Sequence, residues 1–115
     1  MELIILFLLQ IKHWYVDFVN QSAEELAYKG TYMEWRGLTH SIKHGLLTAL
    51  ILIVFIVPEW ALLLGALDFI AHYHIDWYKM NYGATDIKTK QYWNHFGLDQ
   101  MAHQFTYIMI VWSLT

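Results

Sequence analysis

The sequence contains no cysteine, and this absence removes three kinds of chemistry at once. Disulfides, thiolate nucleophiles and thiolate metal ligands are all excluded, so we expect a divalent metal to be held by imidazole and carboxylate groups. Charge is also scarce, since 15% of the 115 residues are Asp, Glu, Lys or Arg and the formal net charge is −3. There is no basic run, so the chain lacks the electrostatic surface that nucleic-acid binding needs.

Linkers are missing as well. No segment rich in Pro, Gly or Ser divides the chain, and its length suits a single domain, residues 1–115. What is present is strongly apolar, with 57% apolar and 17% aromatic residues. An ordinary soluble domain carries about 25% charged residues. The composition therefore predicts an all-α integral membrane protein with the lipid bilayer as a partner.

Four apolar segments of about 17 to 20 residues each are long enough to be predicted as membrane helices. We expect an up-down-up-down four-helix bundle, with a short amphipathic surface helix between the first two spans. Pro58 would separate the second span from the third, because proline cannot continue the helical hydrogen-bond ladder. The predicted spans are residues 3–19, 38–57, 60–78 and 98–114.

The basic residues lie on one side of these spans. All seven Lys and Arg residues fall in the two longer loops or in the helix ends next to them. The positive-inside rule then places both loops in the cytoplasm and both termini outside. Further assembly into a homo-oligomer is left open.

Ionisable residues gather in four clusters with helical i,i+4 spacing, at similar depths in the four spans. Side chains at this spacing differ by about 40° around a helix, so each cluster can face the interior of a bundle. A buried Asp in a membrane helix costs about 2.5 to 3.5 kcal/mol and needs a partner, which a shared cation would supply. The predicted metal ligands are His13, Asp17, His40, His44, Asp68, His72, Asp76, Asp99 and His103.

These ligand types suit one or two divalent ions. Zinc is favoured, and manganese and iron are the alternatives. Asp17 and Asp76 are candidate catalytic carboxylates, with Asp17 as ligand or general base. Gln21 and Gln100 extend the clusters and are expected to support the ligands.

A basic rim near the clusters could bind a phosphate through Lys43, Arg36 or Lys79. His74 points about 200° away from His72 around the helix, and His95 falls in a predicted loop. Both are therefore expected to lie outside the ligand set. The pair Glu24 and Glu25 is expected on a solvated face.

Together the motifs resemble a known family. They are His13-x3-Asp17-Phe18, His40-x3-His44, Asp68-Phe69-x2-His72-x3-Asp76 and Asp99-Gln100-x2-His103. The set is similar to that of small bacterial and phage membrane proteins grouped as domain of unknown function 3307, over nearly the whole chain. The resemblance implies a metal site at these positions and a bacterial inner membrane, but no established activity. Thr39-His40-Ser41 gives a looser likeness to membrane-bound metal-dependent hydrolases.

The favoured function is a membrane-embedded metal-dependent hydrolase that opens to the cytoplasmic face and acts on a lipid or other phosphoester. The bound metal would lower the pKa of its water toward about 7. The alternatives are a di-iron-type lipid oxidase, a proton or metal-ion transporter, a haem-binding bundle and a non-catalytic membrane interaction protein. The outer half of the predicted bundle has few polar groups, which favours an enzyme pocket over a conducting path.

Overall fold

A computed structural model describes all 115 residues of the chain. The structure is entirely helical, with five α-helices and one π-helical turn. In chain order these are α1 (Glu2–Trp14), the π-helical turn η1 (Tyr15–Val19), α2 (Ala23–Tyr28), α3 (Trp35–Leu52), α4 (Pro58–Tyr82) and α5 (Lys90–Trp112).

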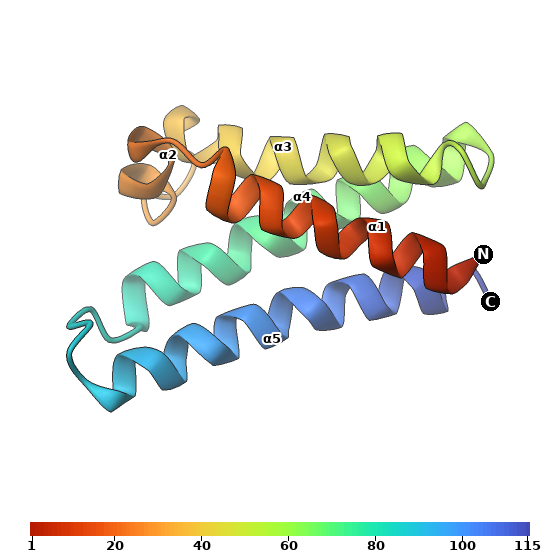
Figure 1. Cartoon of the computed structure of the whole chain (residues 1–115). Coiled ribbons are helices and arrows are strands. Elements are labelled where there is room, and N and C mark those ends of the chain that lie inside the picture. Colours follow the sequence, from red (N-terminus) through yellow and green to blue (C-terminus); the bar gives the residue numbers. More distant parts are fainter.

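The four long helices surround a common interior (Figure 1). α1 contacts α3 and α5, and α4 also contacts α3 and α5, so the order around the interior is α1, α3, α4, α5. The two termini lie side by side at one end, next to the turn between α3 and α4. The short helix α2 and the loop between α4 and α5 lie at the other end.

Local sequence signals fix the starts of three helices. Pro58 occupies the first position of α4, where a missing N–H costs nothing. Ser22 and Glu25 form a capping box on α2, with each side chain bonded to the other residue's backbone N–H. The side chain of Thr89 accepts a hydrogen bond from Tyr92 N and caps α5.

The contact between α3 and α4 depends on two glycines that face each other. A Cβ added to Gly45 would lie 2.7 Å from the Gly65 carbonyl oxygen, and one added to Gly65 would lie 2.6 Å from the Gly45 carbonyl oxygen. Any side chain at either position would force the two backbones apart. The glycines therefore let α3 and α4 approach closely. Gly45 directly follows His44, and Gly65 lies about two turns before His72.

An apolar core fills the end of the molecule that holds the termini. All four long helices contribute side chains to this core, and these side chains are fully or nearly fully buried. The core residues are Ile5, Leu9, Leu52, Ala61, Leu64, Tyr107 and Ile110. The remainder of the interior, toward α2, is polar.

The structure contradicts the predicted membrane spans. None of its helices combines the length and the apolar character that crossing a bilayer requires. α1 has 13 residues, which extend about 20 Å against a hydrocarbon core of about 30 Å. In α4 the apolar sequence is interrupted by Asp68, His72 and Asp76.

The prediction of an integral membrane four-helix bundle, with spans 3–19, 38–57, 60–78 and 98–114, is therefore wrong. The predicted location in a bacterial inner membrane, with both termini outside, rested on those spans and is wrong for the same reason. Ionisable side chains in the middle of the helices face the interior of the protein instead.

Candidate metal centre

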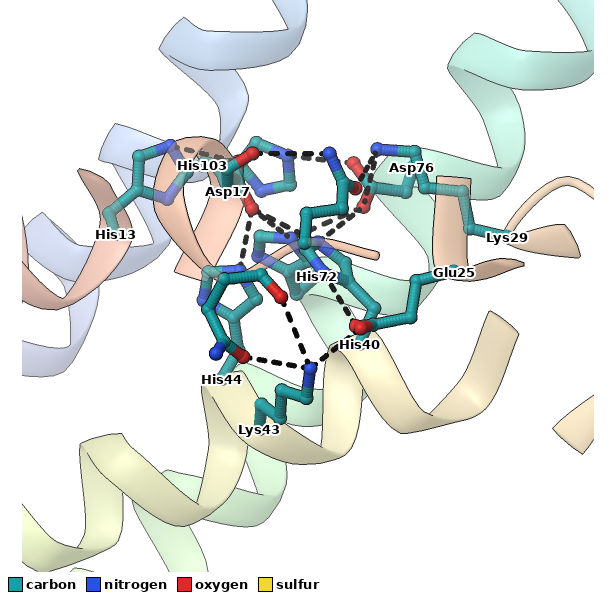
Figure 2. A network of polar contacts seen from close by, with 12 residues as sticks. His13, Asp17, Glu25, Lys29, His40, Lys43, His44, His72, Asp76 and His103 are labelled. Carbon is teal, nitrogen blue, oxygen red and sulfur yellow. Dashed lines mark hydrogen bonds and ion pairs between the residues drawn. The ribbon is translucent and has the colours of Figure 1, made fainter. Parts of the chain in front are cut away.

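Histidine and aspartate side chains from four elements meet in the polar part of the interior (Figure 2). α3 supplies His40 and His44, α4 supplies His72 and Asp76, α5 supplies His103, and η1 supplies Asp17. The His72 ring stacks between two others, with centroids 3.5 Å from His44 and 3.9 Å from His103. The i,i+4 spacing in each helix aims the paired side chains at one point.

Asp17 is the meeting point of a first set of donor atoms. Its Oδ1 lies 2.7 Å from His44 Nε2, 3.0 Å from His40 Nε2 and 3.6 Å from His72 Nε2. Asp17 is placed by the π-helical turn, in which Asn20 N donates to Tyr15 O five residues earlier at 2.8 Å. Single π turns are frequent at functional sites, and the sequence pattern did not predict this one.

Asp76 is the meeting point of a second set. Its Oδ1 lies 3.1 Å from His103 Nε2, and its Oδ2 lies 3.3 Å from His72 Nε2. His72 therefore belongs to both sets, and the donor atoms within each set lie within 4.8 Å of one another. His40 Nε2 also approaches Asp76 Oδ2, at 3.5 Å.

The spacing of these atoms suits a metal ion. Tetrahedral ligands at zinc–nitrogen distances of 2.0 to 2.1 Å lie about 3.3 Å apart, and the separations above run from 2.7 to 3.6 Å. Both ring nitrogens of His40 and of His72, with Asp76 Oδ2, are buried and make no well-aligned hydrogen bond, although several of them lie 3.0 to 3.6 Å from a polar atom of the protein. Buried polar atoms normally have partners, and a cation in each set would supply them.

The carboxylates of both sets are held in the ionised form. Burial raises the pKa of Asp17, but the close imidazoles of His40, His44 and His72 outweigh it and hold this pKa well below its usual range. For Asp76, the close ring of His72 and the hydrogen bond from His103 likewise outweigh burial and lower the pKa strongly. Both carboxylates are therefore poor general bases and good metal ligands.

Two of the histidines differ in charge. Burial lowers the pKa of His44 well below its usual value, so its ring is neutral. For His103, burial acts in the same direction, but hydrogen bonds to Asp76 and Asp99 outweigh it and raise the pKa to about 9. A neutral ring is the form that binds a metal, so a metal at the second set would have to displace a proton from His103.

Glu25 supports the first set, contrary to the prediction that it lies on a solvated face. Its side chain is buried, with Oε2 3.3 Å from His40 Nδ1 and Oε1 2.6 Å from Lys43 Nζ. A carboxylate behind a ligating histidine fixes the ring's orientation. The capping box that starts α2 thus also positions His40.

Three of the predicted ligands lie outside both donor sets. His13 contacts Gln100 Oε1 through Nε2 and the Tyr107 hydroxyl through Nδ1, each at 2.8 Å. Asp99 Oδ2 accepts hydrogen bonds from Lys79 at 3.2 Å and from Gln100 at 3.0 Å. His13 and Asp99 lie beside the centre, and Gln100 contacts both of them.

Asp68 is the third, and it lies about one helical turn away from the centre. Its Oδ2 accepts hydrogen bonds from Lys12 Nζ at 2.9 Å and from Thr48 Oγ1 at 2.5 Å. Lys12 Nζ also lies 3.0 Å from His44 Nδ1 and 3.1 Å from the Tyr107 hydroxyl. Sequence reasoning missed this buried network because Lys12 looked like one more basic residue at a helix end.

The predicted rim cations have different surroundings. Lys43 is bound to Glu25, and Arg36 is exposed with its Nε 2.6 Å from Glu34 Oε1, away from the centre. Lys79 instead lines a cavity of about 370 Å³ that reaches Asp17 and also includes Gln21, Gln100 and Lys29. Lys29, not predicted as a site residue, lies 3.6 Å from Asp76 Oδ2 and donates to Gln21 Oε1 at 3.0 Å.

His74 and His95 also differ from each other. His74 lies outside the centre, bonded to the Tyr32 hydroxyl and to Ile70 O. His95 belongs to α5 rather than to a loop, and it lines the cavity beside Asp17.

The comparison with protein families gives one match. The model of the family described as "Protein of unknown function (DUF3307)" matches residues 5–115. The chain belongs to this family. No curated protein and no solved structure matches it. The likeness to membrane-bound metal-dependent hydrolases therefore has no support from the comparisons, and the chemistry must be argued from the centre itself.

Proposed function

We propose that this member of the family binds divalent transition-metal ions at the two donor sets and hydrolyses an anionic phosphoester in the cavity beside Asp17. The observation that carries the proposal is the convergence of buried donors on Asp17 and Asp76, with His72 shared between them and with several donor atoms, on His40, His72 and Asp76, that make no well-aligned hydrogen bond. Hydrogen bonding within the protein leaves several of these atoms unsatisfied. A cation would satisfy them and would balance the two ionised carboxylates.

The donor set favours zinc. Di-iron centres in helical bundles are built mainly from carboxylates, typically four Glu and two His. Here four histidines accompany two aspartates, a composition that suits zinc better. The tight stacking of the three central rings, at 3.5 and 3.9 Å, also leaves no gap for a haem between two of them.

A metal held by the histidines and by Asp17 or Asp76 would supply a water with a pKa of about 7. In the hydrolysis, the water oxygen forms a bond to phosphorus, the ester P–O bond breaks, and the proton from the water ends on the leaving alcohol. The protein contributes ionised Asp17 and Asp76 as ligands, and it contributes Lys29 and Lys79 as cations that can hold the phosphate oxygens in the cavity.

A transport function has less support. The polar interior continues from the centre to Lys12, Asp68 and Thr48. Beyond these residues the interior is closed by the apolar core, which includes Leu9 and Leu52. A polar path that ends inside the protein suits a pocket better than a route for ions.

The test compares two histidine variants on the same helix. Wild-type protein purified without chelator should contain zinc, or a similar metal, in stoichiometric amount by elemental mass spectrometry. His72→Ala removes the ligand common to both sets and should reduce the metal content to below about a tenth, as expected when a shared ligand is lost. His74→Ala, two residues away but outside the centre, should retain it.

Activity is measured on the same samples with p-nitrophenyl phosphate and bis-p-nitrophenyl phosphate. Hydrolysis should follow the metal content and disappear in His72→Ala. A wild-type protein without metal, or an equal metal content in the two variants, would rule out metal binding at this centre. A stoichiometric metal content without hydrolysis of either ester would mean that the protein binds metal but does not hydrolyse phosphoesters, and it would overturn the hydrolase assignment.

A further inference from the structure

Lys79 and His95 line two cavities at once. The first is the cavity of about 370 Å³ that reaches Asp17. The second has a volume of about 560 Å³ and lies between α4 and α5. Its other walls are formed by apolar and aromatic residues together with Gly83 and two polar residues, His74 and Asp99. The apolar and aromatic residues are Ile75, Tyr78, Tyr82, Leu98 and Ala102. Both volumes fall in the range of small-molecule binding sites.

The first cavity offers several donors to an anion. Lys79 Nζ has one carboxylate partner, Asp99, at 3.2 Å, although an ammonium group carries three donors. Lys29 lies on the opposite side, beside Asp76. His95 Nδ1 accepts a hydrogen bond from Ala84 N at 2.9 Å, so in the neutral ring the proton is on Nε2, which can also donate.

The charges around the centre depend on a bound cation. The four lysines and the protonated ring of His103 match the five carboxylates, so the metal-free surroundings carry no excess charge that would attract an anion. One divalent ion leaves a positive excess for an anion to neutralise, even if it displaces the proton of His103. The groups concerned are the carboxylates of Asp17, Glu25, Asp68, Asp76 and Asp99, and the ammonium groups of Lys12, Lys29, Lys43 and Lys79.

We propose that the two cavities form one binding site for a single-chain alkyl phosphate monoester. The phosphate lies between Lys29, Lys79 and His95 next to Asp17, and the hydrocarbon chain lies between α4 and α5 against Tyr78, Tyr82 and Leu98. This inference rests on the proposed function, because the metal supplies the positive excess. It goes beyond that function by naming a substrate with both a charged and an apolar part.

The test measures the binding of three compounds to the metal-containing protein by titration calorimetry. They are inorganic phosphate, octyl phosphate below its micelle concentration, and octyltrimethylammonium, which has the same chain with the opposite charge. Octyl phosphate is used as its phosphonate analogue, in which a P–C bond replaces the ester bond that the protein would hydrolyse. Each fully buried methylene strengthens binding about fourfold. Octyl phosphate should therefore bind at least about 100-fold more tightly than inorganic phosphate, and the ammonium compound should bind more weakly than octyl phosphate.

Two variants locate the hydrocarbon chain. Ala102→Trp fills the cavity between α4 and α5 and should reduce the affinity for octyl phosphate to near that for inorganic phosphate, which should itself bind as before. Met101→Trp is the matched control, because Met101 is 46% exposed on the same helix and does not line this cavity. It should bind both compounds like the wild type.

The outcomes separate the two proposals. Equal affinity for octyl phosphate and inorganic phosphate, with metal and hydrolysis intact, would overturn this inference and leave the proposed function standing. Equal binding of the ammonium compound would overturn it as well, since the site would not distinguish the sign of the charge. Metal content, measured on the same samples, tests the proposed function independently. The comparison of octyl phosphate with inorganic phosphate in the wild type decides the inference even if Ala102→Trp fails to fold.

Discussion

The two ends of the interior contain different kinds of side chain, apolar at one end and polar or charged at the other. Near the termini, aliphatic side chains such as Ile5, Leu9 and Leu52 pack into a core whose one polar side-chain atom is the Tyr107 hydroxyl, at the edge toward Lys12 and His13. Toward α2, the interior consists of charged and polar side chains, and half of the 26 buried residues in the protein are of this kind. The first region is stabilised by burial alone. The second depends on the balance of charges, and therefore on pH and on bound cations.

The boundary between the two regions is the ion pair of Lys12 and Asp68, and breaking it should have the largest effect on stability. Asp68→Ala leaves the Lys12 ammonium buried without its counter-charge, which typically costs 3 to 5 kcal/mol, or about 4 kcal/mol here. The free energy of unfolding is measured by urea denaturation. The double variant Lys12→Met with Asp68→Leu should recover most of the loss, because it replaces the pair with apolar groups. A double variant as unstable as Asp68→Ala would contradict this account.

The apolar end should respond to loss of volume but not to metal. Leu9 is fully buried in the core, and Leu9→Ala should lower the free energy of unfolding by about 3 kcal/mol, within the usual 2 to 5 kcal/mol. Metal content should be unchanged. Phe7→Ala is the control, because Phe7 is 64% exposed and its loss should change stability by less than about 0.5 kcal/mol. A loss of metal in Leu9→Ala would show that the two regions are coupled.

The polar region should lose stability as pH rises in the metal-free protein. The pKa of His103 is about 9 in the folded chain against an ordinary value of 6.5. Its charged form thus stabilises the fold fully below about pH 6.5, and this contribution, up to about 3 kcal/mol, disappears as pH rises through 9. Urea denaturation of chelator-treated protein between pH 6 and 10 measures the decline. His103→Gln should flatten it, whereas His74→Gln should not.

The smallest effect should come from the residue behind His40. Glu25→Gln keeps the shape of the side chain but weakens its hold on His40 Nδ1, and loss of such a partner typically lowers metal affinity about 10- to 100-fold. Competition with a fluorescent zinc chelator measures the change. Glu24→Gln, the neighbouring exposed carboxylate, should bind metal like the wild type. Equal affinity in Glu25→Gln would mean that His40 is not a ligand.

Sequence reasoning identified most of the centre because helical spacing is a local property. His40, His44, His72, Asp76 and His103 meet as their spacing in the helices implied. It misjudged Asp68, whose partner Lys12 lies 56 residues away in the chain. It also placed Glu25 in solvent, since the fold of α2 against α3 could not be read from its sequence.

The amino-acid composition was a less reliable basis for prediction than the helical spacing. An apolar content of 57% suggested a bilayer, yet many large apolar side chains lie on the surface of the structure, with Leu3 81% exposed and Val54 76%. A count of apolar residues does not say where they lie. The lengths of the helices and the ionisable residues within them decide whether a helix can cross a membrane, and these contradict the predicted spans.

The sequence by itself determined that the chain is helical, that no thiolate ligand is available, and that most histidines and aspartates of the long helices fall at i,i+4 spacing and so face one side. These follow from residue types and from the 3.6-residue period. Only the tertiary structure decided which of these side chains lie close to one another. The close approach of α3 and α4 at Gly45 and Gly65, and the π turn at Asp17, bring the donors within a few ångströms, because such contacts depend on how whole helices pack.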